Sequence, residues 1–365
     1  MALDRPRVGR HGRVSAGQAQ SVELAPGLAK SPCLRILLSA QALATLGAAI
    51  AQAMGPREFE LVSVEQAVAQ SRSDIDIAFI SRDVTGLSTK YELTPALQAC
   101  YQVLRQSAGL QWVHIHSAGA DRPIYQELRD RGVRVSTSSG ANAEVVAQMA
   151  LTGLLALARR LPQMMAAQRR RVWAPLLGER APRDLSGQTA LLVGWGPIGR
   201  RIGEFLRMLG LPLTVLRHGV FDPQLAPDGV RMAGLQDFAR WLPQTDWLLL
   251  ACPLTDQTRR LVDARALALL PPGAGLINVS RGEVVVEADL VAALRTGHLG
   301  SAYLDVFEHE PLAADSPLWA LEQVIVTPHS AGHAQGNAQR VNAMFIANLA
   351  CWCAGQPLRN ELGRG

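Results

Sequence analysis

Three side chains in the second half of the sequence could together bind an anion and transfer a proton. Arg281 offers a forked guanidinium, which binds a carboxylate through two hydrogen bonds. His329 follows a threonine and a proline, and an imidazole titrates near neutral pH. Glu310 is a carboxylate that could raise the pKa of such an imidazole, and Glu308 is the competing choice. These groups would hold a carboxylate, donate a proton and orient the proton donor.

A glycine-rich segment earlier in the chain has the spacing of a dinucleotide-binding turn. Gly194, Gly196 and Gly199 follow an apolar run and open a helical pattern. In such a turn the first glycine makes the bend, the second lets the backbone approach a pyrophosphate, and the third allows close packing of helix on strand. Pro197 lacks an N–H, so a phosphate must use the amides of Ile198 and its neighbours. The pattern also occurs in structural turns, and its place between strand and helix favours dinucleotide binding.

The end of the next predicted strand bears on the choice of cofactor. Enzymes that use NAD usually carry Asp or Glu about 20 residues after the glycines, where it accepts hydrogen bonds from the ribose. Arg217 and His218 stand at this point, and the first carboxylate is Asp222. An arginine cannot accept a hydrogen bond but suits a 2′-phosphate. The sequence therefore favours NADP, with NAD bound through Asp222 as the alternative.

Alternating apolar and amphipathic segments predict the elements that position these residues. Strands are expected at 34–39, 59–64, 75–80, 112–117 and 133–137, and in a second series at 189–193, 213–217, 247–251, 275–278, 301–304 and 324–327. The clearest helices are expected at 41–54, 95–106, 143–160, 198–209, 288–295 and 334–354. The alternation indicates an α/β protein with largely parallel sheets. Because the glycine turn begins the second series, a nucleotide domain inserted into a second domain would explain the order.

Composition limits the class of protein further. The 365 residues favour two domains, and 48% apolar with 18% charged residues excludes a disordered chain and a coiled coil. The net charge of +5 is scattered and no apolar run is long enough to cross a membrane, so we expect neither a nucleic-acid partner nor a membrane. The five cysteines lack zinc-site spacing, which favours a reduced, cytoplasmic protein without a metal. Residues 1–32 are basic and polar, and we expect them to form a disordered tail.

Further motifs occur in an order typical of one enzyme family. They are Cys252-Pro253-Leu254-Thr255 followed by Thr258, Asn278-Val279-Ser280-Arg281-Gly282, Asp305-Val306-Phe307 with Glu310-Pro311, and Thr327-Pro328-His329. With the glycine turn, they resemble the D-isomer-specific 2-hydroxyacid dehydrogenases over about residues 34–362. Arg217 and the stretch 285–290 look closest to the glyoxylate/hydroxypyruvate reductases. The four residues 330–333 depart from the family pattern.

The resemblance implies roles for individual residues. The catalytic trio would be Arg281, Glu310 and His329, with Glu310 chosen over Glu308 because the family carboxylate directly precedes a proline. The substrate carboxylate would be bound by Ala118, Gly119, Ala120 and Arg281. The cofactor would be bound by Gly194, Gly196, Pro197, Ile198, Gly199, Arg217, His218, Cys252, Pro253 and Asp305, the last near the nicotinamide.

The resemblance also implies the architecture. We expect two Rossmann-like domains, in which a doubly wound nucleotide domain at 139–332 is inserted into a flavodoxin-like substrate domain at 33–138 and 333–365. Members of the family usually pair as homodimers through the nucleotide domain, and the apolar helix at 143–160 is the expected contact.

The predicted function is NADP-dependent reduction of a small 2-oxo acid, such as glyoxylate or hydroxypyruvate, to the D-2-hydroxy acid. Two alternatives stay open. One is an NAD-preferring dehydrogenase that acts on a larger 2-oxo acid. The other is a non-catalytic, dinucleotide-sensing module similar to the transcriptional corepressors that this family resembles.

Overall fold

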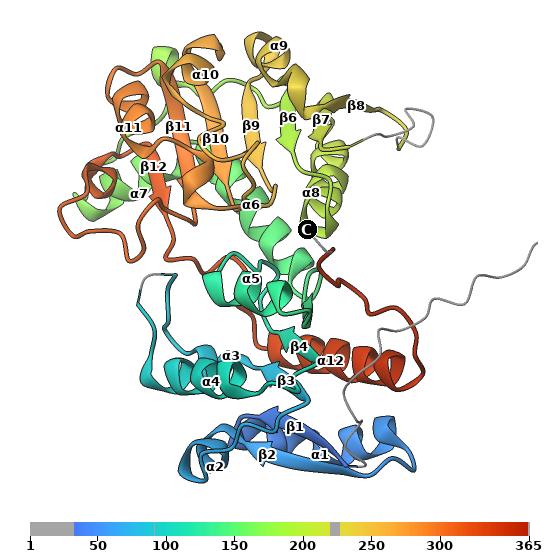
Figure 1. The fold of residues 1–365 in the computed structure, drawn as a ribbon. Coiled ribbons are helices and arrows are strands. Elements are labelled where there is room, and N and C mark those ends of the chain that lie inside the picture. The colour runs from blue at the N-terminus through green and yellow to red at the C-terminus, as the bar shows by residue number, and fades with distance from the viewer. Residues whose placement is uncertain (1–32, 91, 220–226, 364–365) are drawn as a thin grey trace, which may run out of the picture. The chain divides into compact units, whose positions relative to one another are not determined.

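The computed structural model describes residues 33–90, 92–219 and 227–363. Within them the chain forms two parallel β-sheets, one of five strands and one of seven, with helices packed against them (Figure 1). The predicted α/β class with two Rossmann-like sheets is therefore confirmed. The expected tail at 1–32 and Asp222 lie outside the described residues. No helix in the described part is long and apolar enough to cross a membrane.

The first sheet has the strand order β2-β1-β3-β4-β5, which is typical of flavodoxin-like folds. Its strands are β1 (Leu34–Leu38), β2 (Phe59–Ser63), β3 (Ile77–Ile80), β4 (Trp112–Ile115) and β5 (Arg134–Thr137). The central strands are buried on both faces, which is why they are short apolar runs without polar alternation. Helix α1 (Ala40–Met54) begins where the Ser39 hydroxyl accepts a hydrogen bond from the Ala42 amide at 2.9 Å.

The second sheet has the doubly wound order β12-β11-β10-β9-β6-β7-β8, which reverses between β6 and β9. Its strands are β6 (Ala190–Val193), β7 (Leu213–Arg217), β8 (Val230–Gly234), β9 (Trp247–Leu250), β10 (Ala274–Asn278), β11 (Leu299–Leu304) and β12 (Val324–Val326). The polar motifs singled out in the sequence all follow carboxyl ends of these strands. Because parallel strands end at one edge of a sheet, the fold gathers the motifs along that edge.

Helices cover the two sheets. They are α1, α2 (Val64–Ala69), α3 (Arg82–Thr85), α4 (Pro95–Gln106), α5 (Pro123–Asp130), α6 (Ala143–Ala158), α7 (Leu161–Arg169), α8 (Pro197–Met208), α9 (Phe238–Trp241), α10 (Ala264–Leu269), α11 (Glu287–Arg295) and α12 (Asn337–Cys353). Helix α6 packs on α8 and on the second sheet, and its Gly153 lies so close to the Tyr303 ring that a side chain there would collide. The apolar face of α6 is therefore buried within its own sheet layer.

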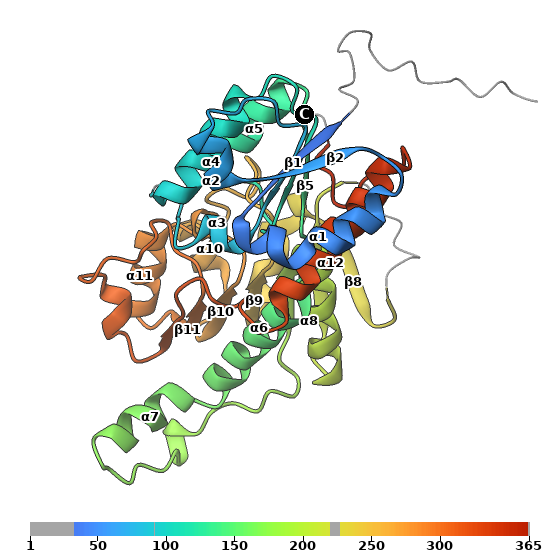
Figure 2. The ribbon, with the colours of Figure 1, turned by 90° about the horizontal axis from the view of Figure 1, so that it is seen from below.

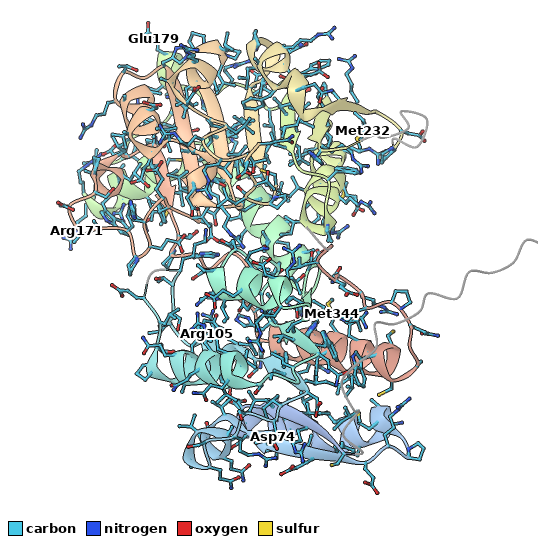
Figure 3. All side chains as sticks on the ribbon, in the orientation of Figure 1. Asp74, Arg105, Arg171, Glu179, Met232 and Met344 are labelled. Carbon is cyan, nitrogen blue, oxygen red and sulfur yellow. The ribbon has the colours of Figure 1, made fainter. Side chains whose placement is uncertain are left out.

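The last helix returns to the first sheet. In Figures 1 and 2, α12 lies beside α1, and Figure 3 shows Met344 on this helix. The Phe345 ring of α12 stacks on Phe79 of β3 with 4.5 Å between centroids. Beyond the helix, the Leu362 amide donates to the Val135 carbonyl of β5 at 2.8 Å. The end of the chain is thus part of the first sheet's layers, while the exact domain boundaries stay a prediction.

Candidate active site

His329 and Glu310 form a hydrogen-bonded pair beyond the ends of β12 and β11. The Nδ1 atom of His329 lies 2.8 Å from Glu310 Oε2, and the other Glu310 oxygen accepts from the Phe307 amide at 3.1 Å. An ionised carboxylate only accepts hydrogen bonds, so Nδ1 carries the proton of this contact and Nε2 is left for exchange with a substrate. Burial alone would raise the pKa of Glu310, but the hydrogen bond and charge of His329 lower the pKa below its ordinary value.

The structure distinguishes Glu310 from Glu308 as the carboxylate that contacts His329. Glu308 accepts a hydrogen bond from the Glu287 amide at 3.3 Å, at the start of α11. The carboxylate that contacts the imidazole is therefore the one directly before the proline, Glu310.

Asp305 holds the loop that carries His329. One of its oxygens accepts from the Thr327 hydroxyl at 2.6 Å and from the Ser330 amide at 2.8 Å, and the Ala331 amide donates to both oxygens. Tyr303 extends the network, because its hydroxyl lies 2.9 Å from that of Thr327. Burial raises the pKa of Asp305. In the structure its carboxylate anchors this loop, and its expected contact with the nicotinamide stays a prediction.

Arg281 lies directly against the predicted substrate loop. A side chain at Gly119 would collide with the Arg281 guanidinium where it now lies, so the glycine leaves room for this guanidinium beside the loop. Within the described residues, no acceptor binds the backbone N–H groups of Ala118, Gly119 and Ala120. Asn278 shapes the Arg281 turn, since its side chain donates to the Arg281 carbonyl at 3.1 Å and accepts from Ser280. The structure thus brings together an arginine and three free amides, which suits an anion.

The glycine turn fits a dinucleotide pyrophosphate. Gly194 has a φ of 106°, and a side chain there would lie 2.6 Å from the Ala251 carbonyl oxygen. Gly199 packs against Gly194 in the same way, whereas a Cβ on Gly196 would meet nothing within 4 Å. The open space at Gly196 therefore lies where a phosphate would approach. The first-turn amides of α8 at Ile198 and Gly199 have no helical acceptor, and Pro197 removes a donor that would be unpaired anyway.

Arg217 ends the strand beside this turn. The Gly194 amide donates to the Leu216 carbonyl at 2.8 Å, so Arg217 and His218 follow directly at the same sheet edge. This is where the adenosine ribose lies in dinucleotide-binding folds. The placement agrees with the prediction of a 2′-phosphate contact but does not test it.

The loop after β9 carries Cys252 and Pro253. Burial raises the pKa of the Cys252 thiol to about 12, so this sulfur is neutral and no nucleophile at physiological pH. Thr258 fixes the loop, because its hydroxyl donates to the Pro253 carbonyl at 2.7 Å and accepts from the Thr255 amide at 2.8 Å. These two hydrogen bonds explain why a threonine stands at position 258, three residues after Thr255. The cofactor contacts of this loop stay a prediction.

The sequence analysis did not identify a group of basic side chains near His329. It comprises Arg82, His116, Arg122 and His333. Burial together with the charges of Arg82 and Arg122 lowers the pKa of His116 to about 4. Burial and the charges of Arg82 and His329 also lower the pKa of His333. Because β3 and β4 are neighbours, their carboxyl ends bring Arg82 and His116 to one place. The one sequence signal was the unusual segment that ends in His333.

A pyrophosphate turn at a helix N-terminus, an imidazole–carboxylate pair and an anion-binding arginine along the same edge define an NAD(P)-dependent oxidoreductase. Within the described residues, no group of three or more His, Cys, Asp or Glu side chains is placed to hold a metal ion.

Comparison with known proteins gives the family. Residues 151–331 match the NAD-binding domain of the D-isomer specific 2-hydroxyacid dehydrogenases. The chain is 34% identical to (S)-sulfolactate dehydrogenase of Chromohalobacter salexigens over 252 residues, which is 68% of this chain and 79% of that protein. It is 32% identical to glyoxylate/hydroxypyruvate reductase A of Arabidopsis thaliana over 265 residues, 70% and 80% of the two chains. A crystal structure of a D-isomer specific 2-hydroxyacid dehydrogenase from Xanthobacter autotrophicus, with NADPH and MES, has a TM-score of 0.70 at 27% identity and covers 92% of this chain and 99% of that one.

The chain belongs to the D-isomer-specific 2-hydroxyacid dehydrogenase family. The family predicted from the motifs is therefore confirmed, and with it an enzyme that uses a nicotinamide cofactor. The roles of the individual residues stay predictions.

Proposed function

We propose that the protein reduces a small 2-oxo acid of the glyoxylate or hydroxypyruvate type to the D-2-hydroxy acid, with NADPH as the reductant. The observation that carries the proposal is the His329–Glu310 pair on the edge where Arg281 lies against the free amides of the Gly119 loop. The relative from Arabidopsis thaliana, named as a glyoxylate/hydroxypyruvate reductase, supports the substrate class.

Each residue of the pair and the loop has a defined task in this reaction. The amides of Gly119 and Ala120 bind the substrate carboxylate, and Arg281 binds the carboxylate and polarises the ketone oxygen. Bound nicotinamide supplies the hydride that the carbonyl carbon receives. His329 donates the Nε2 proton to the developing alkoxide, so the ketone gains one hydride and one proton. Glu310 accepts from Nδ1 and stabilises the protonated imidazole until that transfer.

Arg217 supports the choice of NADPH. This residue ends β7, directly after Leu216, whose carbonyl accepts from the Gly194 amide, and a guanidinium suits a 2′-phosphate better than a ribose hydroxyl. The relative from Xanthobacter autotrophicus binds NADPH, which agrees with this assignment.

We also infer two domains and a homodimer. The substrate domain comprises 33–138 and 333–365, the nucleotide domain comprises 139–332, and the cleft between them closes on substrate to exclude water. Helix α6 buries its apolar face against its own sheet, so we place the dimer contact in the next segment, α7 and the chain up to Leu177. Figure 2 shows α7 projecting away from the sheet, and this segment exposes several large apolar side chains. All five cysteines are free thiols, which agrees with a reducing compartment such as the cytoplasm.

Initial rates with glyoxylate and with hydroxypyruvate, each with NADPH and with NADH at equal concentration, test the proposal. We expect turnover that prefers NADPH, and we expect Arg217→Gln to weaken NADPH about 10- to 100-fold, the range for a charge-assisted hydrogen bond. Arg231→Gln is the matched control. Arg217 pairs with Gly234 at the carboxyl end of β8, whereas Arg231 lies near the amino end of that strand and covers the Trp241 ring. Turnover that prefers NADH would contradict the role of Arg217. Tight dinucleotide binding without turnover of any 2-oxo acid would favour the binding module.

A further inference from the structure

Four charged side chains form a continuous series that ends at Arg281. Glu283 accepts from Lys90 Nζ at 2.7 Å, and Nζ lies 2.5 Å from Asp121 Oδ2. Asp121 binds Arg281 with both oxygens, at 3.2 Å from Nε and 3.3 Å from Nη2. Lys90 and Asp121 lie on loops of the first sheet, and Glu283 and Arg281 lie on the loop after β10. Lys90, Asp121 and Glu283 also line a cavity of about 410 Å³.

The contact with Asp121 determines which donors of Arg281 are free. A guanidinium has five N–H groups. Two of them point to Asp121, and a third, on Nη1, donates to the Ser280 carbonyl at 2.7 Å. Among the described residues, no acceptor binds the other two, one on Nη1 and one on Nη2. A substrate therefore meets these two donors, and Asp121 and Ser280 fix where they point.

We propose that Asp121 is a positioning residue for the reaction. It holds Arg281 so that the two free donors meet the carboxylate and ketone oxygens of the substrate. Lys90, itself bound by Glu283, neutralises the charge of Asp121 next to the site of an anionic substrate. This inference rests on the proposed role of Arg281.

The charges of the series explain why Lys90 is needed. Two carboxylates and two cations sum to zero, so the series itself does not repel an anion. Burial alone would raise the pKa of Asp121, but Arg281 and Lys90 lower it well below its ordinary value, so Asp121 is ionised. Without Lys90, this anion would repel a carboxylate bound at Gly119 and Ala120, which are two residues and one residue before Asp121 in the chain.

Two substitutions separate the parts of this proposal. Asp121→Asn keeps an oxygen but removes the ion pair, so Arg281 is less well held while the local charge rises by one. We expect kcat to fall about 10- to 100-fold, the order found for a displacement of about 1 Å, while KM for the 2-oxo acid does not rise. Lys90→Met leaves the Asp121–Arg281 pair intact and lowers the local charge by one. We expect KM to rise about fivefold, the upper range for a partly exposed charge, with kcat within about threefold.

Steady-state kinetics with glyoxylate and NADPH measure these values, and titration with oxamate, an unreactive analogue, measures binding alone. Glu127→Gln is the matched control, since it removes a carboxylate of the first sheet's helices that pairs with Arg105 at the surface (Figure 3). It should leave kcat, KM and oxamate affinity unchanged.

Opposite effects of the two variants on kcat and KM would support the proposal. Wild-type kcat in Asp121→Asn, or parallel losses in both variants, as expected from a merely structural role, would overturn it. Wild-type protein without turnover would overturn the proposed function instead. In that case the oxamate titration still tests the inference, because only Lys90→Met should weaken binding.

Discussion

His329 has a backbone φ of 49°, in the left-handed region that costs an L-residue roughly 1–2 kcal/mol. Two backbone carbonyls, of Asp305 and Thr327, accept from its amide at 2.8 Å and 3.0 Å. The Asp305 side chain then binds the amides of the next two residues, Ser330 and Ala331. These contacts offset the cost and hold the imidazole at one place. If His329 is the proton donor, as we propose, it is oriented before substrate binds, which is the arrangement that acid catalysis requires.

Replacement of His329 should abolish turnover without loss of cofactor. In His329→Ala we expect kcat to fall about 10³-fold or more, within the range for a lost acid–base group. The dissociation constant of NADPH, measured by fluorescence titration, should change little because the glycine turn lies on other strands. His298→Gln is the control. His298 directly precedes β11, at the edge of the sheet opposite the strand ends that carry His329, and its imidazole contacts the Leu267 carbonyl. Loss of NADPH binding in His329→Ala would contradict the assigned role.

The sequence was informative about residue types at the site but not about their partners. Arg281, Glu310 and His329 were predicted from chemistry and motif order, and the structure brings Glu310 and His329 together. Spacing alone could not decide between Glu308 and Glu310, because the turn that carries them has no periodic pattern. Asp305 shows the same limit, since its anchoring of the His329 loop depends on two neighbouring strand ends.

At the scale of the element, β4 carries an internal polar network. The Ser136 hydroxyl oxygen accepts from the Trp112 indole at 2.8 Å and lies 2.8 Å from Nδ1 of His114. The Ser138 hydroxyl donates to the Ile115 carbonyl, so Nε2 of His114 must donate to Ser138. Because burial keeps this imidazole neutral, Nδ1 carries no proton and accepts from the Ser136 hydroxyl. A second proton on His114 would meet the proton of Ser136.

Stability should therefore fall in mild acid. Burial lowers the pKa of His114 to about 3, and burial with nearby cations lowers that of His116 to about 4. An unfolded histidine takes up a proton near pH 6.5, so between pH 6.5 and about 4 the unfolded chain binds protons that the folded chain does not. The free energy of unfolding should decrease as pH falls, by up to about 1.4 kcal/mol per pH unit for each histidine.

Urea unfolding of the wild type and of His116→Gln between pH 8 and pH 4.5 tests this expectation. The variant should lose about one histidine's share of the slope below pH 6.5. The two proteins should have the same slope above pH 7.5, where both histidines are neutral in both states. An unchanged slope below pH 6.5 would show that His116 is protonated in the folded protein.

Strands and helices with a strong apolar pattern were predictable from the sequence. Strand β8 and helix α7 show why other elements were not. All eleven expected strands are present, but β8 was missed because its sequence Val-Arg-Met-Ala-Gly has only one β-branched residue and it lies at the edge of the sheet. Helix α7 was missed because it has only 9 residues, and its three large apolar side chains, Leu161, Met164 and Met165, are too few to define a helical pattern. Elements this short contain too few residues for a periodic pattern to stand out in the sequence.

At the scale of the whole molecule, the contacts that join the two halves of the site were beyond sequence analysis. Lys90 and Glu283 are 193 residues apart, and Asp121 and Arg281 are 160 residues apart. Each side chain on its own has the pattern of a solvated surface charge. The pairs join loops of the first sheet to the loop after β10, so they depend on the folded chain and on no local sequence pattern. Motif order singles out Arg281 as a candidate, but it gives no indication of the Asp121 carboxylate that binds the guanidinium.

Self-association through the segment after α6 is the expectation that belongs to this scale. Trp173 is 95% exposed and Leu177 is 71% exposed, and α7 adds the partly exposed Leu161, Met164 and Met165. Contiguous exposed apolar side chains of this size indicate a surface that another chain covers. A twofold dimer would bury Trp173 twice, so Trp173→Glu should raise the dimer dissociation constant about 100-fold or more. Sedimentation equilibrium should then give twice the 39.3 kDa chain mass for the wild type and the single mass for the variant.

A control is needed because any exposed apolar residue affects solubility. Met208 on α8 is 81% exposed but stands apart from this segment, so Met208→Glu should remain a dimer. A monomeric wild type would refute the dimer. A dimeric Trp173→Glu would move the interface elsewhere on the nucleotide domain. Turnover of the monomeric variant would then show whether each chain completes its own active site, as the placement of His329, Arg281 and Gly119 within one chain leads us to expect.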